Sequence, residues 1–133
     1  MTAVDKYFFT PIYYPRNSWS VIKWWESRRL LFNVSVGATG LVSLGAATFF
    51  ATLPPHPARF LVPAVVVLVY GVLANICYTL GAPVDLLLRR RLGERAAAVG
   101  PVLFRYGFVF SLGLTLLPIP LAVLSWVVRW FVH

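Results

Sequence analysis

Residues 17–52 read NSWSVIKWWESRRLLFNVSVGATGLVSLGAATFFAT, and this stretch decides the fold. Its first part is polar and aromatic and ends in Arg28-Arg29, and an uncharged apolar run follows from Leu30 to Thr52. At a helical rise of about 1.5 Å per residue, the run spans about 34 Å, enough to cross a hydrocarbon core about 30 Å thick. The pattern predicts a transmembrane helix over residues 30–52, with a collar of tryptophans and cations at the lipid–water boundary.

The composition of the whole chain indicates an integral membrane protein. Its 133 residues are 59% hydrophobic and 12% charged, whereas soluble domains average about 45–50% apolar and about 25% charged residues. The net charge of +8 does not indicate nucleic-acid binding, because the cations cluster beside apolar runs, where they suit anionic lipid headgroups. The single cysteine, Cys77, excludes an intrachain disulfide. We expect no cleavable signal peptide, since residues 1–16 lack an apolar core.

Two further apolar runs predict transmembrane helices at about residues 60–80 and 102–128. Pro118 and Pro120 lie inside the last run and predict a kink, because each proline removes a backbone donor. The alternative is a span that ends at Leu117, followed by a separate short helix over residues 121–131. The fold class is therefore an all-α integral membrane protein with three transmembrane helices.

The segment between the second and third spans predicts an amphipathic helix. Gly81-Ala82-Pro83 is expected to end the second span, and residues 84–98 combine several leucines with four arginines. Asp85 suits the first turn of such a helix and can pair with Arg89 at i+4. We expect residues 84–98 to lie on the membrane plane as a short interfacial helix, within a single transmembrane domain that covers residues 17–133.

Residues 1–16 form an aromatic N-terminal arm. Two prolines, Pro11 and Pro15, argue against a regular helix. The favoured interpretation is an extended arm in the headgroup layer at the membrane interface. An arm packed on a partner subunit and a disordered arm are the alternatives.

The collar before the first span contains the residues expected to meet headgroups or partners. Asn17 or Ser18 is a plausible N-cap, Glu26 can pair with Arg29, and Trp25 can stack on Arg29. Together with the later arginines, the residues expected to contact lipid headgroups or a partner are Trp24, Trp25, Arg28, Arg29, Arg89, Arg90 and Arg91.

Small residues at four-residue spacing predict the packing face of the first span. They are Ser35, Thr39, Ser43 and Ala47. Small side chains let helix backbones approach closely in lipid, so this face should meet another helix, of this chain or of another. Two amides, Asn33 and Asn75, lie at membrane depth. Asn33 should bond a neighbouring helix or the interface, whereas for Asn75 a hydrogen bond between helices is the simplest role and a ligand or ion site is the alternative.

The distribution of cations predicts the orientation. Ten of the twelve lysines and arginines lie before the first span or between the second and third, and Arg59 and Arg129 alone lie on the opposite side. By the positive-inside rule, the N-terminus should be cytoplasmic and the C-terminus outside, in a bacterial plasma (inner) membrane. Anionic headgroups are therefore expected partners on the cytoplasmic side.

The sequence carries no motif for a metal, a cofactor or a reaction. The two histidines, His56 and His133, fall outside the spans, and the spans hold no Asp, Glu or Lys. We therefore expect no catalytic, cofactor-binding or metal-ligating residue.

These observations favour a non-catalytic accessory or scaffolding subunit, packed by helix contacts in a larger bacterial membrane complex, for example a respiratory or photosynthetic one, as a hetero- or homo-oligomer. One alternative is a homo-oligomeric pore or small transporter lined by Asn75, Ser35, Thr39 and Ser43. The other is a membrane-surface enzyme acting on lipid headgroups, with Glu26 or Asp85 as its acid–base residue.

Overall fold

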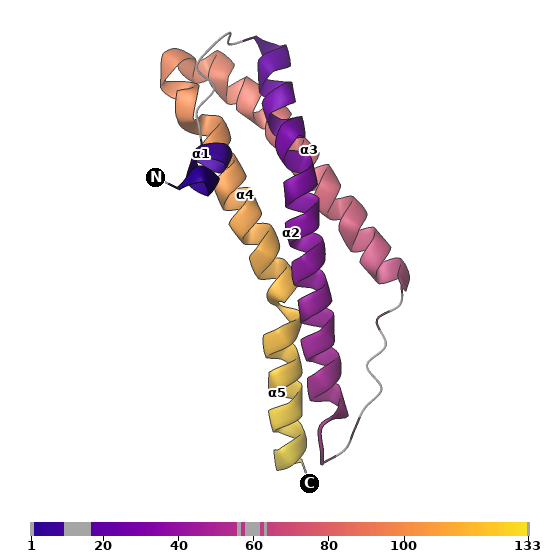
Figure 1. Ribbon diagram of the computed structural model, residues 1–133. Coiled ribbons are helices and arrows are strands. Elements are labelled where there is room, and N and C mark those ends of the chain that lie inside the picture. The colour runs from indigo at the N-terminus through magenta and orange to yellow at the C-terminus, as the bar shows by residue number, and fades with distance from the viewer. Residues whose placement is uncertain (1, 10–16, 56, 58–61, 63, 133) are drawn as a thin grey trace.

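The structure is a computed structural model that describes residues 2–9, 17–55, 57, 62 and 64–132. Over these residues it is helical and contains no strand. The elements are α1 (Ala3–Phe9), α2 (Ser18–Thr52), α3 (Ala64–Leu92), the 3₁₀-helix η1 (Gly93–Ala98), α4 (Val99–Leu116) and α5 (Pro118–Phe131). In Figure 1, α2 runs the full length of the bundle, α4 and α5 follow one another beside it, and α3 crosses it at an angle.

Three helical segments are long and apolar enough to cross a membrane: Ser18–Thr52, Ala64–Leu92 and Val99–Phe131. This confirms the prediction of three helices long and apolar enough to cross a membrane. The helix α2 contains both the collar and the first span without a break. Its N-cap is Asn17, whose side-chain Oδ1 accepts from the backbone N–H of Ser20 at 2.8 Å, so one of the two predicted caps is the correct one.

The predicted helix end at Gly81-Ala82-Pro83 is wrong. The helix α3 continues through Pro83 to Leu92, and the chain turns only at Gly93, whose φ of +57° suits a residue without a Cβ. Tyr78 before Pro83 and Asp85 after it both contact Trp25 of α2. Side-chain contacts on both sides of the proline therefore hold this helix to α2. Residues 84–98 are therefore not a separate interfacial helix, because they form the last turns of α3 and then η1.

The third span consists of two helices separated by one residue. The helix α4 ends at Leu116 and α5 begins at Pro118, three residues earlier than the separate helix considered from the sequence. Pro118 is the first residue of α5, where its missing N–H costs least. Pro118 has no N–H to donate to the carbonyl oxygen of Leu114. That oxygen accepts instead from the N–H of Leu117 at 3.3 Å.

The N-terminal arm is helical where the structure describes it, so the expectation of an extended arm is wrong for residues 3–9. The helix α1 covers Ala3–Phe9, which precede both prolines of the arm in the sequence. At its start, hydrogen bonds from the Thr2 hydroxyl and backbone N–H hold the pKa of the Asp5 carboxyl below its usual value. Residues 10–16 lie outside the described residues.

An aromatic core joins the three spans near the arginine-rich end. Tyr78 of α3 packs on Trp25 and Phe32 of α2, with ring centroids 5.4 and 4.6 Å apart. Phe104 of α4 contacts Trp25 and Tyr78 edge to face. Such pairs contribute about 0.5–1.5 kcal/mol each beyond their buried area. The core therefore holds the arginine-rich ends of α2, α3 and α4 in fixed relative positions.

Candidate functional site

A buried carboxylate lies at the junction of α2, α3 and α4. The side chain of Asp85 is 0% exposed and accepts a hydrogen bond from Trp25 Nε1 at 3.2 Å. Its other oxygen is 2.7 Å from Nε of Arg89, one turn later in α3. A buried carboxylate needs such partners, because its desolvation costs several kcal/mol. The predicted Asp85–Arg89 pair is therefore present, and it belongs to the core rather than to the surface.

Two glycines provide the space for this junction. A Cβ added at Gly81 would lie 2.5 Å from the ring of Trp25, and one added at Gly100 would lie 2.6 Å from Oδ2 of Asp85. Both glycines therefore allow α2, α3 and α4 to approach closely around the indole and the carboxylate.

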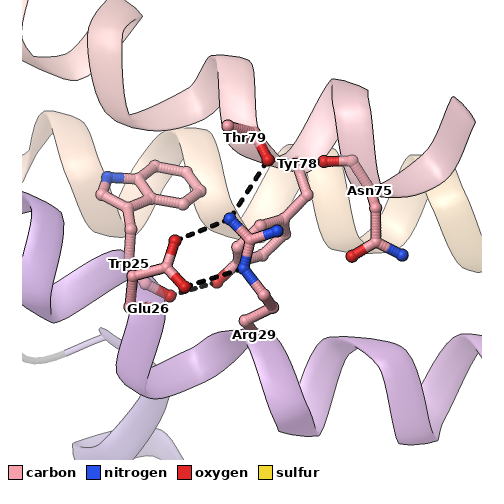
Figure 2. Close-up of polar contacts among 6 residues, drawn as sticks. All are labelled: Trp25, Glu26, Arg29, Asn75, Tyr78 and Thr79. Carbon is pink, nitrogen blue, oxygen red and sulfur yellow. Dashed lines mark hydrogen bonds and ion pairs between the residues drawn. The ribbon is translucent and has the colours of Figure 1, made fainter. Parts of the chain in front are cut away.

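A second polar cluster joins the outer surfaces of α2 and α3. Figure 2 shows the guanidinium of Arg29 between Glu26 of its own helix and Thr79 of α3. Arg29 donates to both carboxylate oxygens of Glu26, at 2.6 and 2.9 Å, and to Thr79 Oγ1 at 3.1 Å. The guanidinium lies 5.3 Å from the centroid of the Tyr78 ring, so it stacks on a tyrosine and not, as expected, on Trp25. The Tyr78 hydroxyl donates to the carbonyl of Trp25 at 2.6 Å.

Arg28 fastens α1 to α2. Its guanidinium lies 4.0 Å from the ring centroid of Trp24 and 4.9 Å from that of Tyr7, and it donates to the carbonyl of Tyr7. The Tyr7 hydroxyl in turn donates to the carbonyl of Ser27 at 2.8 Å. Arg28 is 6% exposed, so its side chain is buried among residues of this chain.

The residues expected to meet headgroups or partners therefore divide into two groups. Trp25 and Arg28 are buried, and Trp24, Arg29 and Arg89 are half-buried. Arg90 and Arg91 are exposed. The cations left at the surface of this end of the bundle are Lys6, Lys23, Arg90, Arg91, Arg95 and Arg105.

A cavity of about 560 Å³ lies at membrane level between α2, α3 and the junction of α4 with α5. Its wall is mostly apolar, and its polar members come from α2, α3 and α4: Asn33, Ser43, Tyr70, Asn75 and Thr115. The hydroxyls of Tyr70 and Thr115 lie 2.5 Å apart, and Thr115 donates to the carbonyl of Ser111 at 2.6 Å. The buried hydroxyl of Ser43 has no hydrogen-bond partner among the described residues.

The predicted packing face lies partly within this bundle. Ser43 and Ala47 are buried, whereas Ser35 and Thr39 are half-buried. The Asn75 amide donates to the carbonyl of Gly71 in the same helix at 3.0 Å, and among the described residues it has no hydrogen bond to a neighbouring helix. Asn33 is exposed at one end of the cavity.

Sequence reasoning missed the contacts that close the opposite end of the bundle. Arg129 of α5 donates to the carbonyls of Phe50 and Ala51 at 2.7 and 3.1 Å, and so satisfies the last turn of α2. Trp126 Nε1 donates to the carbonyl of Pro54 at 2.9 Å. Tyr70 and Tyr78 were also missed, although two tyrosines eight residues apart in an otherwise apolar run were a signal that one face of the second span is buried.

Glu26 and Asp85, the acids considered for catalysis, are each paired with an arginine. Among the residues that the structure describes, no group of three His, Cys, Asp or Glu side chains could hold a metal ion. The chain matches no protein-family model, no curated protein and no solved structure.

Proposed function

We propose that this chain is a non-catalytic accessory or scaffolding subunit of a larger membrane complex. The observation that carries the proposal is a shallow groove of about 600 Å³ along the outer surface of α3. Three small or polar residues lie at four-residue spacing along it, Gly71, Asn75 and Thr79, and the apolar side chains of Leu68, Val72 and Ile76 flank it.

The groove fits the packing of a transmembrane helix from another subunit. Small residues at this spacing let a second backbone approach closely, and the carboxamide of Asn75 offers a polar contact at membrane depth. The first turns of α3 are also poorly covered by this chain, since every residue from Ala64 to Val69 is exposed. A partner helix along α3 would bury this surface.

The arginine-rich end completes the proposal. Arg90, Arg91 and Arg95 are exposed there and would bind anionic headgroups on the cytoplasmic side of a bacterial inner membrane. In this arrangement α1 and η1 face the cytoplasm, and the end of α5 faces outward.

The test is gentle extraction of the tagged protein from its native membrane, followed by native mass measurement. We expect the wild-type chain to be recovered with at least one other membrane subunit. Val72→Trp, which places an indole in the α3 groove, should remove that subunit. The matched control is Val109→Trp on α4, since Val72 and Val109 are 59% and 62% exposed. Recovery of the wild-type chain as a lone monomer, or equal recovery of the partner with both variants, would overturn the proposal.

A further inference from the structure

The cavity between α2 and α3 shares Val67, Gly71 and Asn75 with the outer groove of α3, extends inward to α2 and α4, and has the size of a small-molecule site. Its volume of about 560 Å³ falls within the range of about 300–1,000 Å³ that is typical of ligand pockets. Its lining on α2 extends from Asn33 to Leu44, a rise of about 17 Å.

One side chain in the wall of the cavity indicates which functional group a ligand would carry. Ser43 is 2% exposed and lines the cavity, and its hydroxyl is unpartnered among the described residues. The neighbouring hydroxyls of Tyr70 and Thr115 are already bonded to each other and to Ser111. A buried hydroxyl without a partner costs about 1–3 kcal/mol, so a ligand with a hydrogen-bond acceptor at this position would be favoured.

The charge of the lining restricts the ligand further. No lysine, arginine or histidine is among the described residues that line the cavity, so a carboxylate or phosphate would be buried without a counter-ion. The acceptor should therefore be neutral, and the body of the ligand should be apolar, as are the walls formed by Val36, Leu41, Val66 and Val67.

We propose that the α2–α3 cavity binds a neutral lipid-soluble molecule whose carbonyl oxygen accepts a hydrogen bond from Ser43. This chemistry has two sources in a membrane, the ester of a glycerolipid and the ring carbonyl of a prenyl quinone.

The test uses the full-length protein in detergent with three probes: a decyl-substituted 1,4-benzoquinone, dioleoylglycerol and decylbenzene, which lacks a carbonyl. We expect one carbonyl probe to raise the thermal unfolding midpoint, because a ligand that binds only the folded state stabilises it. The probe that binds identifies the source. No shift with either carbonyl probe, or an equal shift with decylbenzene, would overturn the proposal.

Variants separate the cavity from nonspecific partitioning into the micelle. Gly37→Leu fills the cavity, and Gly45→Leu is its control, since Gly45 is on the same helix and outside the lining; a Cβ at either glycine meets no atom within 4 Å. We expect Gly37→Leu to abolish binding and Gly45→Leu to preserve it. Ser43→Ala should weaken binding of the carbonyl probe about three- to tenfold, and Ser43→Thr should restore it. Undiminished binding by Gly37→Leu would refute the site, and undiminished binding by Ser43→Ala would refute the role of the hydroxyl.

Native mass measurement provides the last discrimination. A bound lipid mass that is present in wild-type protein and lost in Gly37→Leu supports the proposal. A second polypeptide that is lost in Gly37→Leu, with no lipid in either sample, would show that the cavity receives a partner helix and would overturn it.

Discussion

The indole Nε1 of Trp25 donates to Oδ2 of Asp85 at 3.2 Å, and this contact joins two helices through residues sixty positions apart in the chain. Asp85 is also paired with Arg89, which lies in the last turn of α3. One buried carboxylate therefore connects α2 to the part of α3 that follows Pro83. The carboxylate is satisfied on both oxygens, and the helix ends around it are held together.

Replacing this carboxylate should destabilise the fold. Asp85→Asn leaves the guanidinium of Arg89, which is 12% exposed, without its counter-charge. Loss of one partner of a buried pair costs about 3–5 kcal/mol, and we expect a loss near the lower value because Arg89 lies in the last turn of α3. The measurement is the free energy of unfolding in mixed micelles.

Glu26→Gln is the control for that variant. It removes the charge of Glu26 from the Glu26–Arg29 pair, whose side chains are 52% and 29% exposed, and exposed pairs contribute about 0–1 kcal/mol. Equal effects of the two variants would show that the burial of Asp85 has no energetic consequence.

Close approach at two glycines gives a second prediction. Gly81→Ala and Gly100→Ala should each lower stability by about 1–3 kcal/mol, because the added methyl group overlaps the Trp25 ring or the Asp85 carboxylate. Gly45→Ala meets open space and should be neutral or stabilising by up to about 1 kcal/mol, since alanine favours a helix. Thermal unfolding of the three variants in one detergent tests this, and a Gly81→Ala protein as stable as Gly45→Ala would contradict it.

The attachment of α1 depends on the planar guanidinium of Arg28. Lysine retains the charge but cannot stack between Tyr7 and Trp24 while donating to a carbonyl, so Arg28→Lys should release α1. A helix of seven residues has little stability when it is detached. We expect amide hydrogen exchange across Ala3–Phe9 to accelerate about tenfold or more, which corresponds to about 1.4 kcal/mol.

The comparison for that experiment is Arg90→Lys, which changes an exposed arginine in the last turn of α3. Exchange across α1 should stay at the wild-type rate in this variant. If Arg28→Lys also left the rate unchanged, the stacking of Arg28 would not be what holds α1.

Features encoded within a few residues could be predicted from the sequence. The three spans follow from long apolar runs, and the Asn17 cap, the Glu26–Arg29 pair and the Asp85–Arg89 pair are contacts within one helical turn. Each depends on spacing along a single helix, which the sequence displays directly.

Features that depend on where the helices meet could not be predicted. Gly81-Ala82-Pro83 favours a helix end locally, and α3 continues because the Trp25 ring and Asp85 hold it on both sides of the proline. The contacts of Arg129 with the last carbonyls of α2 have no local signature, since 78 and 79 residues separate the partners. For the same reason, Ser43 could be predicted only as part of a helix-packing face, whereas in the structure it also lines a cavity.

Orientation in the membrane can be tested by labelling single cysteines with a membrane-impermeant maleimide. Cys77 is first replaced by alanine, and a cysteine is introduced at Thr2, just before α1, or at Val132, just after α5. Because ten of the twelve Lys and Arg residues flank the cytoplasmic ends of the proposed spans, we expect Val132→Cys to be labelled in intact cells and Thr2→Cys only after permeabilisation. The reverse pattern would place the arginine-rich end outside and would remove the basis for anionic headgroup binding on the cytoplasmic side.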